Sequence, residues 1–101
     1  MRVYNNDDKG SVYVNDEKVF EEDNQTGDWI DITDLLAAGK ANTVQFRNWN
    51  DRGSAWWRFA VRRNNNIVWE ETGKKPDAAE NRNRFVYDKT LTITADGELK
   101  E

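Results

Sequence analysis

The chain has 101 residues, with 15 Lys and Arg, 19 Asp and Glu, and neither His nor Cys. This is the length of one domain, and apolar residues at 37% suffice for one modest core. The absence of Cys excludes disulfides and zinc–thiolate sites, and the absence of His removes the usual general base. We therefore expect a single domain over residues 1–101 that binds or supports other molecules and is not an enzyme.

The net charge of −4 is unevenly distributed along the chain. Residues 1–40 carry 4 basic and 10 acidic side chains, residues 41–69 carry 5 and 1, and residues 70–101 carry 6 and 8. The basic residues of the middle segment are all Arg, and the same segment holds four of the five Trp. Two interpretations remain open: these Arg side chains pair with acids on neighbouring strands, or they stack with Trp on a sugar or a base.

The first half of the chain mostly shows the two-residue period that is typical of strands. Residues 12–14 alternate, and Asn15 and Asp16 predict a tight hairpin turn because both residue types tolerate positive φ. A return strand is expected at residues 18–22, and a short strand at residues 30–32.

One short helical turn is predicted near residues 34–38. Thr33 is a suitable N-cap, and Gly39 is a suitable end. Leu35 and Leu36 are expected to cover one end of the core.

The middle of the chain predicts a strand at residues 43–47, a loop at residues 48–54 and a second strand at residues 56–62. A turn is expected at residues 64–66 and a return strand at residues 67–69.

The last third predicts a polar loop at residues 71–83 and then a region in which Leu91 and Ile93 alternate with Thr. The tail, residues 96–101, is expected to fray.

Seven or eight short strands separated by turns predict an all-β fold, either an antiparallel sandwich or a barrel. The alternation also predicts its core. The predicted core residues are Val12, Val14, Ile30, Ile32, Val44, Phe46, Trp57, Phe59, Val61 and Ile93.

Two segments resemble the galactose-binding-domain-like jelly-roll sandwiches, which include the sugar-binding domains of family 2 glycosidases. Residues 5–8 followed by 12–16 resemble their "DD…YVNG" segment, and residues 29–36 followed by 39–46 resemble their "DITDLLKPGKNTL-V" segment. Residues 57–69 resemble the hairpin that follows in such domains, so the resemblance covers roughly residues 5–69. It implies an antiparallel two-sheet β-sandwich of the jelly-roll type and a carbohydrate-associated, non-catalytic role. Binding residues vary among these domains, so none is carried over.

A calcium site is the one cofactor that the sequence suggests. Asn5, Asp7 and Asp8 supply oxygen donors, which suit Ca²⁺, and the resemblance implies that such domains often hold structural calcium. The alternative is a solvated turn, which is the more frequent use of clustered Asn and Asp.

A ligand site is predicted around the aromatic residues of the middle segment. A flat ring can cover the C–H face of a sugar while polar neighbours bond its hydroxyl groups. The candidate residues are Trp49, Asn50, Arg52, Trp56 and Arg58. By the strand period Trp57 points inward with Phe59, so Trp56 and Arg58 point outward; the alternative for Trp49 and Trp56 is a Trp–Arg stack at the sheet edge.

Three functions are compatible with these features. The first is a non-catalytic carbohydrate-binding accessory module of an extracellular or cell-surface protein. Residues 1–10 are too polar for a signal peptide, so the chain is expected to be either cytoplasmic or a piece of such a longer protein. The second is a structural or protein–protein interaction module that packs against a neighbouring domain or chain. Nucleic-acid binding is disfavoured because the chain is acidic, and membrane association is not expected because no apolar run approaches ~20 residues.

Overall fold

The structure is a computed structural model that describes the backbone of residues 1–26 and 29–101, and their side chains except those of residues 4–9 and 20–26. It contains eight strands and two single 3-10 turns, η1 (Thr33–Leu35) and η2 (Ala79–Asn81). The strands are β1 (Arg2–Val14), β2 (Glu17–Thr26), β3 (Ile30–Asp31), β4 (Asn42–Asn50), β5 (Ala55–Arg63), β6 (Asn66–Lys75), β7 (Arg84–Ile93) and β8 (Leu99–Lys100).

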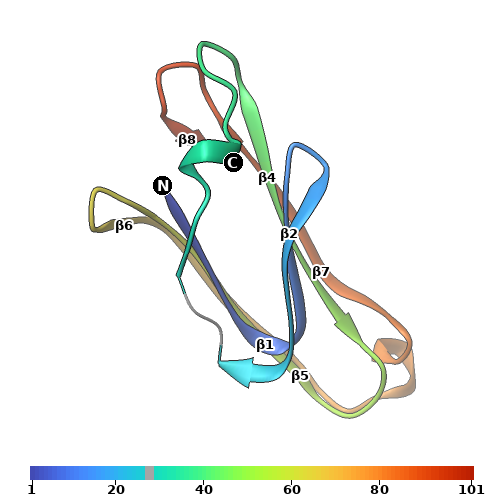
Figure 1. Cartoon of the computed structure of the whole chain (residues 1–101). Coiled ribbons are helices and arrows are strands. Elements are labelled where there is room, and N and C mark those ends of the chain that lie inside the picture. The colour runs from blue at the N-terminus through green and yellow to red at the C-terminus, as the bar shows by residue number, and fades with distance from the viewer. Residues whose placement is uncertain (27–28) are drawn as a thin grey trace.

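The strands form two antiparallel sheets that share β1 (Figure 1). Residues 2–7 of β1 pair with β5, which places β6, β5, β1 and β3 in a four-stranded sheet. Residues 10–14 of β1 pair with β4, which places β2, β1, β4, β7 and β8 in a five-stranded sheet. The predicted all-β two-sheet sandwich is confirmed, and the finer jelly-roll topology stays a prediction.

The core lies between the two sheets and joins them. Phe46 of β4 contacts Phe59 of β5 and Trp69 of β6, with ring centroids 5.1 and 5.2 Å apart. Nine of the ten predicted core residues are buried, and Ile30 is half-buried against them. Val3 and Leu91 complete the cluster.

The hairpin turns agree with the prediction. Asn15 and Asp16 have φ of 50° and 69° and join β1 to β2, and Asn64 and Asn65 have φ of 50° and 65° and join β5 to β6. Positive φ at both central positions defines the type I′ turn, whose twist suits a two-residue hairpin.

Several element boundaries differ from the prediction, mainly because polar strand residues resemble loop residues in sequence. Residues 5–8 lie within β1 and do not form a turn, residues 48–50 continue β4, and residues 71–75 continue β6. The tail was expected to fray, but residues 99 and 100 pair with β7, and the turn before them is closed by hydrogen bonds between Thr94 and residues 97 and 98.

The predicted helical turn is present but is capped differently. It spans Thr33–Leu35 with Ile32 at the N-cap position and no side-chain cap, so the prediction for Thr33 was wrong. The Thr33 amide and hydroxyl instead donate to Asp31 Oδ1, at 2.9 and 2.6 Å. Leu36 packs against the core, whereas Leu35 is exposed.

Within the described residues, no helix has the length and hydrophobicity required to span a membrane.

Candidate functional site

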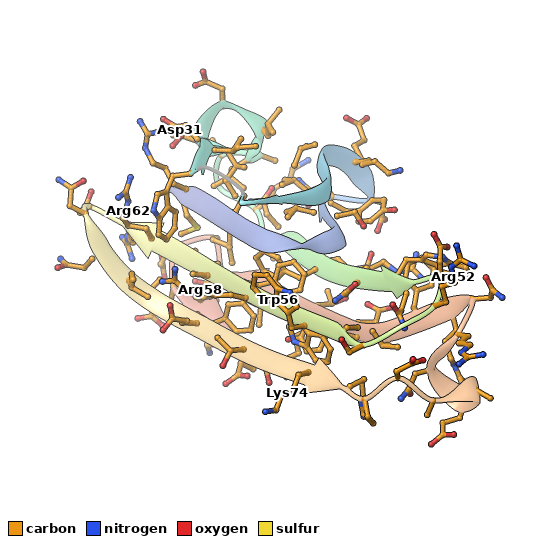
Figure 2. The ribbon with its side chains drawn as sticks, turned by 90° about the horizontal axis from the view of Figure 1, so that it is seen from below. Asp31, Arg52, Trp56, Arg58, Arg62 and Lys74 are labelled. Atoms are coloured by element: carbon orange, nitrogen blue, oxygen red, sulfur yellow. The ribbon has the colours of Figure 1, made fainter. Side chains whose placement is uncertain are left out.

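The outer face of the four-stranded sheet carries the most exposed aromatic ring of the described chain. Trp56 lies on β5 with 47% of its surface exposed, while its neighbour Trp57 is 6% exposed and packs in the core. A strand places successive side chains on opposite faces, so burial of Trp57 directs Trp56 outward. Figure 2 shows Trp56 and Arg58 on the same face of β5.

Two shallow depressions flank the Trp56 ring. One is lined by residues 54–56 and by Lys74, Lys75 and Pro76. The other is lined by residues 56–58 and 72–74. Lys74 is directly opposite Trp56 in the β5–β6 register, so the two side chains extend from the same face of neighbouring strands.

Arg58 is held by an ion pair with the neighbouring strand. Its Nε donates to Glu70 Oε2 at 2.7 Å, and both side chains are partly exposed. This contact fixes the guanidinium beside Trp56 and leaves part of it accessible to a ligand. An exposed pair of this kind contributes little to stability, on the order of 0–1 kcal/mol.

Lys74 and Lys75 were missed by the sequence analysis, which placed them in a loop. The sequence held no signal for this extension, because residues 70–75 contain no apolar side chains that alternate along a strand.

Trp49 is not part of this surface. It lies on β4 of the five-stranded sheet, on the face that points away from the core. Its ring meets Phe85 edge-on at 4.9 Å between centroids, and its Nε1 donates to Asp51 Oδ1 at 2.7 Å. Trp49 and Trp56 therefore occupy opposite outer faces of the sandwich.

Asn50 and Arg52 are also separated from Trp56. Asn50 is 3% exposed, and its amide donates to the carbonyls of Gly53 and Asn81 at 3.1 and 2.7 Å, which joins two loops. Arg52 is exposed in the loop at the end of β4, away from Trp56 (Figure 2). Of the five candidate ligand residues, the structure brings together Trp56 and Arg58.

Most of the basic middle segment has partners within the fold. Arg47 pairs with Asp88 across β4 and β7 at 3.3 Å, as Arg58 pairs with Glu70. The guanidinium of Arg62 lies over the Trp29 ring, 4.4 Å from its centroid, and Arg63 donates to the Gly97 carbonyl at 2.9 Å. Cross-strand pairing accounts for Arg47 and Arg58, and Arg–Trp stacking accounts for Arg62.

The calcium prediction falls on side chains outside the described ones. The backbone of Asn5, Asp7 and Asp8 lies in β1. Among the residues whose side chains are described, no group of three or more acidic residues is placed to hold a metal ion.

A hydrogen-bonded pair that the sequence did not predict lies between β6 and β7. It consists of the Glu71 carboxylate and the Tyr87 phenol. The Tyr87 hydroxyl donates to Glu71 Oε2, and the Tyr87 ring packs against Trp57 and Phe59. Burial raises the pKa of Tyr87 above its ordinary value, and the hydrogen bond to Glu71 and the charge of that carboxylate raise it further. The pair thus links β6 of the four-stranded sheet to β7 of the five-stranded sheet.

Comparison of the chain with protein-family models, curated proteins and solved structures gives no match.

Proposed function

We propose that this chain is a non-catalytic carbohydrate-binding module that uses the outer face of its four-stranded sheet. The observation that carries the proposal is the exposed Trp56 ring between two depressions, with Arg58 and Lys74 beside it. The ring would stack on the apolar face of a sugar, and the two cationic groups would donate hydrogen bonds to its hydroxyl groups. The resemblance to galactose-binding-like domains agrees with this function.

The test is a glycan array read with the wild-type chain and with Trp56→Ala. We expect the wild type to bind and Trp56→Ala to lose binding, while its free energy of unfolding changes by less than about 1 kcal/mol because the side chain is exposed. Trp56→Phe keeps an aromatic face and should retain part of the binding.

Ile67→Ala is the matched control, since Ile67 is an exposed apolar residue near the far end of the same sheet. This variant should bind like the wild type. An array on which the wild type binds nothing, or on which Trp56→Ala binds normally, would contradict the proposal.

The second candidate is a module that packs against a neighbouring protein. It is favoured by Ile67 and Val68, which are exposed at 51% and 47% on β6. Exposed apolar residues on an edge strand are typical of surfaces that pair with another chain.

A further inference from the structure

Strand β6 is an edge of the four-stranded sheet. In the described part of the chain, it pairs with β5 on one side only. Residues of an antiparallel strand direct their N–H and C=O groups alternately to the two sides, so about half of these groups on β6 point away from β5. Such an edge can be extended by another strand.

The regular part of this edge is short and well defined. The register with β5 shifts between Val61 and Arg62, which pair with Trp69 and Ile67, so Val68 is an additional residue on β6. From Trp69 to Lys75 every residue has a consecutive partner on β5. Beyond the shift the strand is irregular, so regular pairing with a further strand is expected for residues 69–75.

Two copies of this edge can pair antiparallel about a two-fold axis perpendicular to the sheet. Residues opposite each other then lie on the same face of the extended sheet. Residues 69–75 pair completely with their own copy only when the axis passes through Thr72, the midpoint of the segment. The geometry of the edge thus selects one register.

The chemistry of the strand fits that register. Glu70 of each copy lies opposite Lys74 of the other copy, so the two-fold axis produces two Glu70–Lys74 pairs. Thr72 faces Thr72, Glu71 faces Gly73, and Trp69 faces Lys75, so no two like charges are opposite each other. Opposite charges in such cross-strand positions stabilise a sheet, whereas like charges destabilise it.

Neighbouring registers are less favourable. An axis through Glu71 or Glu70 places two copies of that carboxylate opposite each other, and an axis through Lys74 places two ammonium groups opposite each other. An axis through Gly73 places Glu71 opposite Lys75, but it pairs only residues 71–75 of the regular segment and places Glu70 opposite Pro76, which has no N–H to donate. The Glu70 carboxylate is also available for the new contact, because both contacts with Arg58 use Oε2. Lys74 has no ion pair among the described residues.

We propose that the chain forms a two-fold symmetric dimer in which the β6 strands of two copies pair antiparallel about Thr72. The contact joins the four-stranded sheets into one eight-stranded sheet. A seven-residue strand pair is smaller than a standard interface, so the dimer is expected to be weak, with a dissociation constant of roughly 10 µM to 1 mM.

The test measures the dimerisation constant by sedimentation equilibrium over that concentration range. Glu70→Lys places two Lys–Lys pairs in the interface, and Lys74→Glu places two Glu–Glu pairs there. Each variant alone should weaken dimerisation by about tenfold or more. An equimolar mixture of the two variants restores both opposite-charge pairs in a heterodimer, and its affinity should return to within about threefold of the wild type.

Lys40→Glu is the matched control, because it makes the same charge change in an exposed loop away from β6. It should dimerise like the wild type. Thermal unfolding of each variant tests whether it folds. Lys74→Glu removes no ion pair or hydrogen bond of the described chain, so it is expected to change the interface without a large change in stability.

The proposal is overturned if the wild type stays monomeric to about 1 mM. It is equally overturned if the two variants dimerise like the wild type, or if their mixture is no tighter than either variant alone.

Discussion

At the scale of single residues, Trp56 and Trp57 show how one peptide bond separates a surface from a core. Trp57 packs 5.1 Å from the Tyr87 ring and is nearly buried, whereas Trp56 is half exposed on the other side of the same sheet. The two-residue period of the strand accounts for this difference.

Trp57→Ala is expected to reduce the free energy of unfolding by roughly 3–5 kcal/mol, because it removes a large aromatic side chain from the core. Trp57→Phe should cost much less, since it keeps a ring and removes an indole N–H that is buried without a hydrogen-bond partner among the described residues. Chemical denaturation of the three proteins measures both values. An unchanged midpoint in Trp57→Ala would show that the ring is not in the core.

Gly73 should be coupled to Trp57. A Cβ atom at Gly73 would collide with Cζ2 and Cε2 of the Trp57 indole, so Gly73→Ala should destabilise the wild type by about 1–3 kcal/mol. The same change should cost less in a Trp57→Phe background, because the smaller ring leaves space. A double-mutant cycle measures the coupling, and additive effects would contradict the contact.

Tyr87 is expected to make the free energy of unfolding depend on pH in the alkaline range. Its pKa is raised above the ordinary value of 10.0 by burial and by its hydrogen bond to Glu71. The unfolded chain therefore releases this proton at a lower pH than the folded chain does. The stabilising contribution is complete below about pH 10 and is lost as the pH rises above it.

The measurement is the free energy of unfolding between about pH 8 and pH 12. Wild-type stability should fall above about pH 10, and Tyr87→Phe should reduce this fall. Tyr13→Phe, which leaves the Tyr87–Glu71 pair intact, is the control. Equal slopes for the wild type and Tyr87→Phe would show that the pair does not set the alkaline limit.

At the scale of elements, strand β4 shows how polar residues can continue a strand into a buried end. Asn42, Asn48 and Asn50 share the inner face with Val44 and Phe46 and are all buried. The Asn42 amide donates to the carbonyls of residues 37 and 40, and the Asn50 amide to those of residues 53 and 81. The Asn48 amide donates to the Trp56 carbonyl at 3.4 Å, while its Oδ1 has no partner among the described residues. Buried polar groups are tolerated when they are bonded in this way.

The β1–β2 turn offers a stabilising change. Asp16 has a φ of 69°, a conformation that glycine adopts without a Cβ penalty. Asp16→Gly produces the Asn-Gly pair preferred in type I′ turns and should stabilise the chain by a few tenths to about 1 kcal/mol. Asp16→Val, which disfavours positive φ, should destabilise it; equal melting temperatures for the two variants would contradict the turn assignment.

At the scale of the whole molecule, β1 is the element that makes the two sheets one unit. Its first half completes the four-stranded sheet, and its second half completes the five-stranded sheet. The aromatic contacts of Phe46 cross between the sheets in the same core. Neither sheet can separate without breaking β1 or exposing that core.

Unfolding should therefore be a single cooperative transition. Denaturation followed by far-UV circular dichroism and by Trp fluorescence should give coincident curves, because both report on the same event. Two separate transitions would show that the sheets are independent units.

The proposed dimer has a consequence for the proposed function. A two-fold axis perpendicular to the sheet keeps both outer faces on the same side. With strands ~4.8 Å apart and a rise of ~3.3 Å per residue, the two Trp56 Cα atoms would lie about 20 Å apart on one surface. Two weak sites at that spacing would bind a repetitive ligand more tightly than one site does.

The local features of the fold follow from the amino-acid pattern alone. Alternation along Val12–Val14, Val44–Phe46 and Trp57–Val61 predicted strands and the residues that face the core, since the period of a strand is a local property. The Asn-Asp and Asn-Asn pairs predicted hairpin turns because these residue types tolerate positive φ, which is also a local property. These features were sufficient to predict an all-β antiparallel fold, and the resemblance to jelly-roll domains favoured a sandwich over a barrel.

The faces that lie together depend on contacts between residues that are far apart in the chain. Trp49 and Trp56 are close in sequence, yet they belong to different sheets and point to opposite sides of the sandwich. The sequence predicts Asn50 to be a loop residue. In the structure it is a buried residue of β4, and its amide donates to the carbonyls of residues 53 and 81. The extension of β6 through Lys75 depends on its pairing with β5. A single strand's period defines two faces, but the assignment of a face to core or surface depends on distant residues that pack against it.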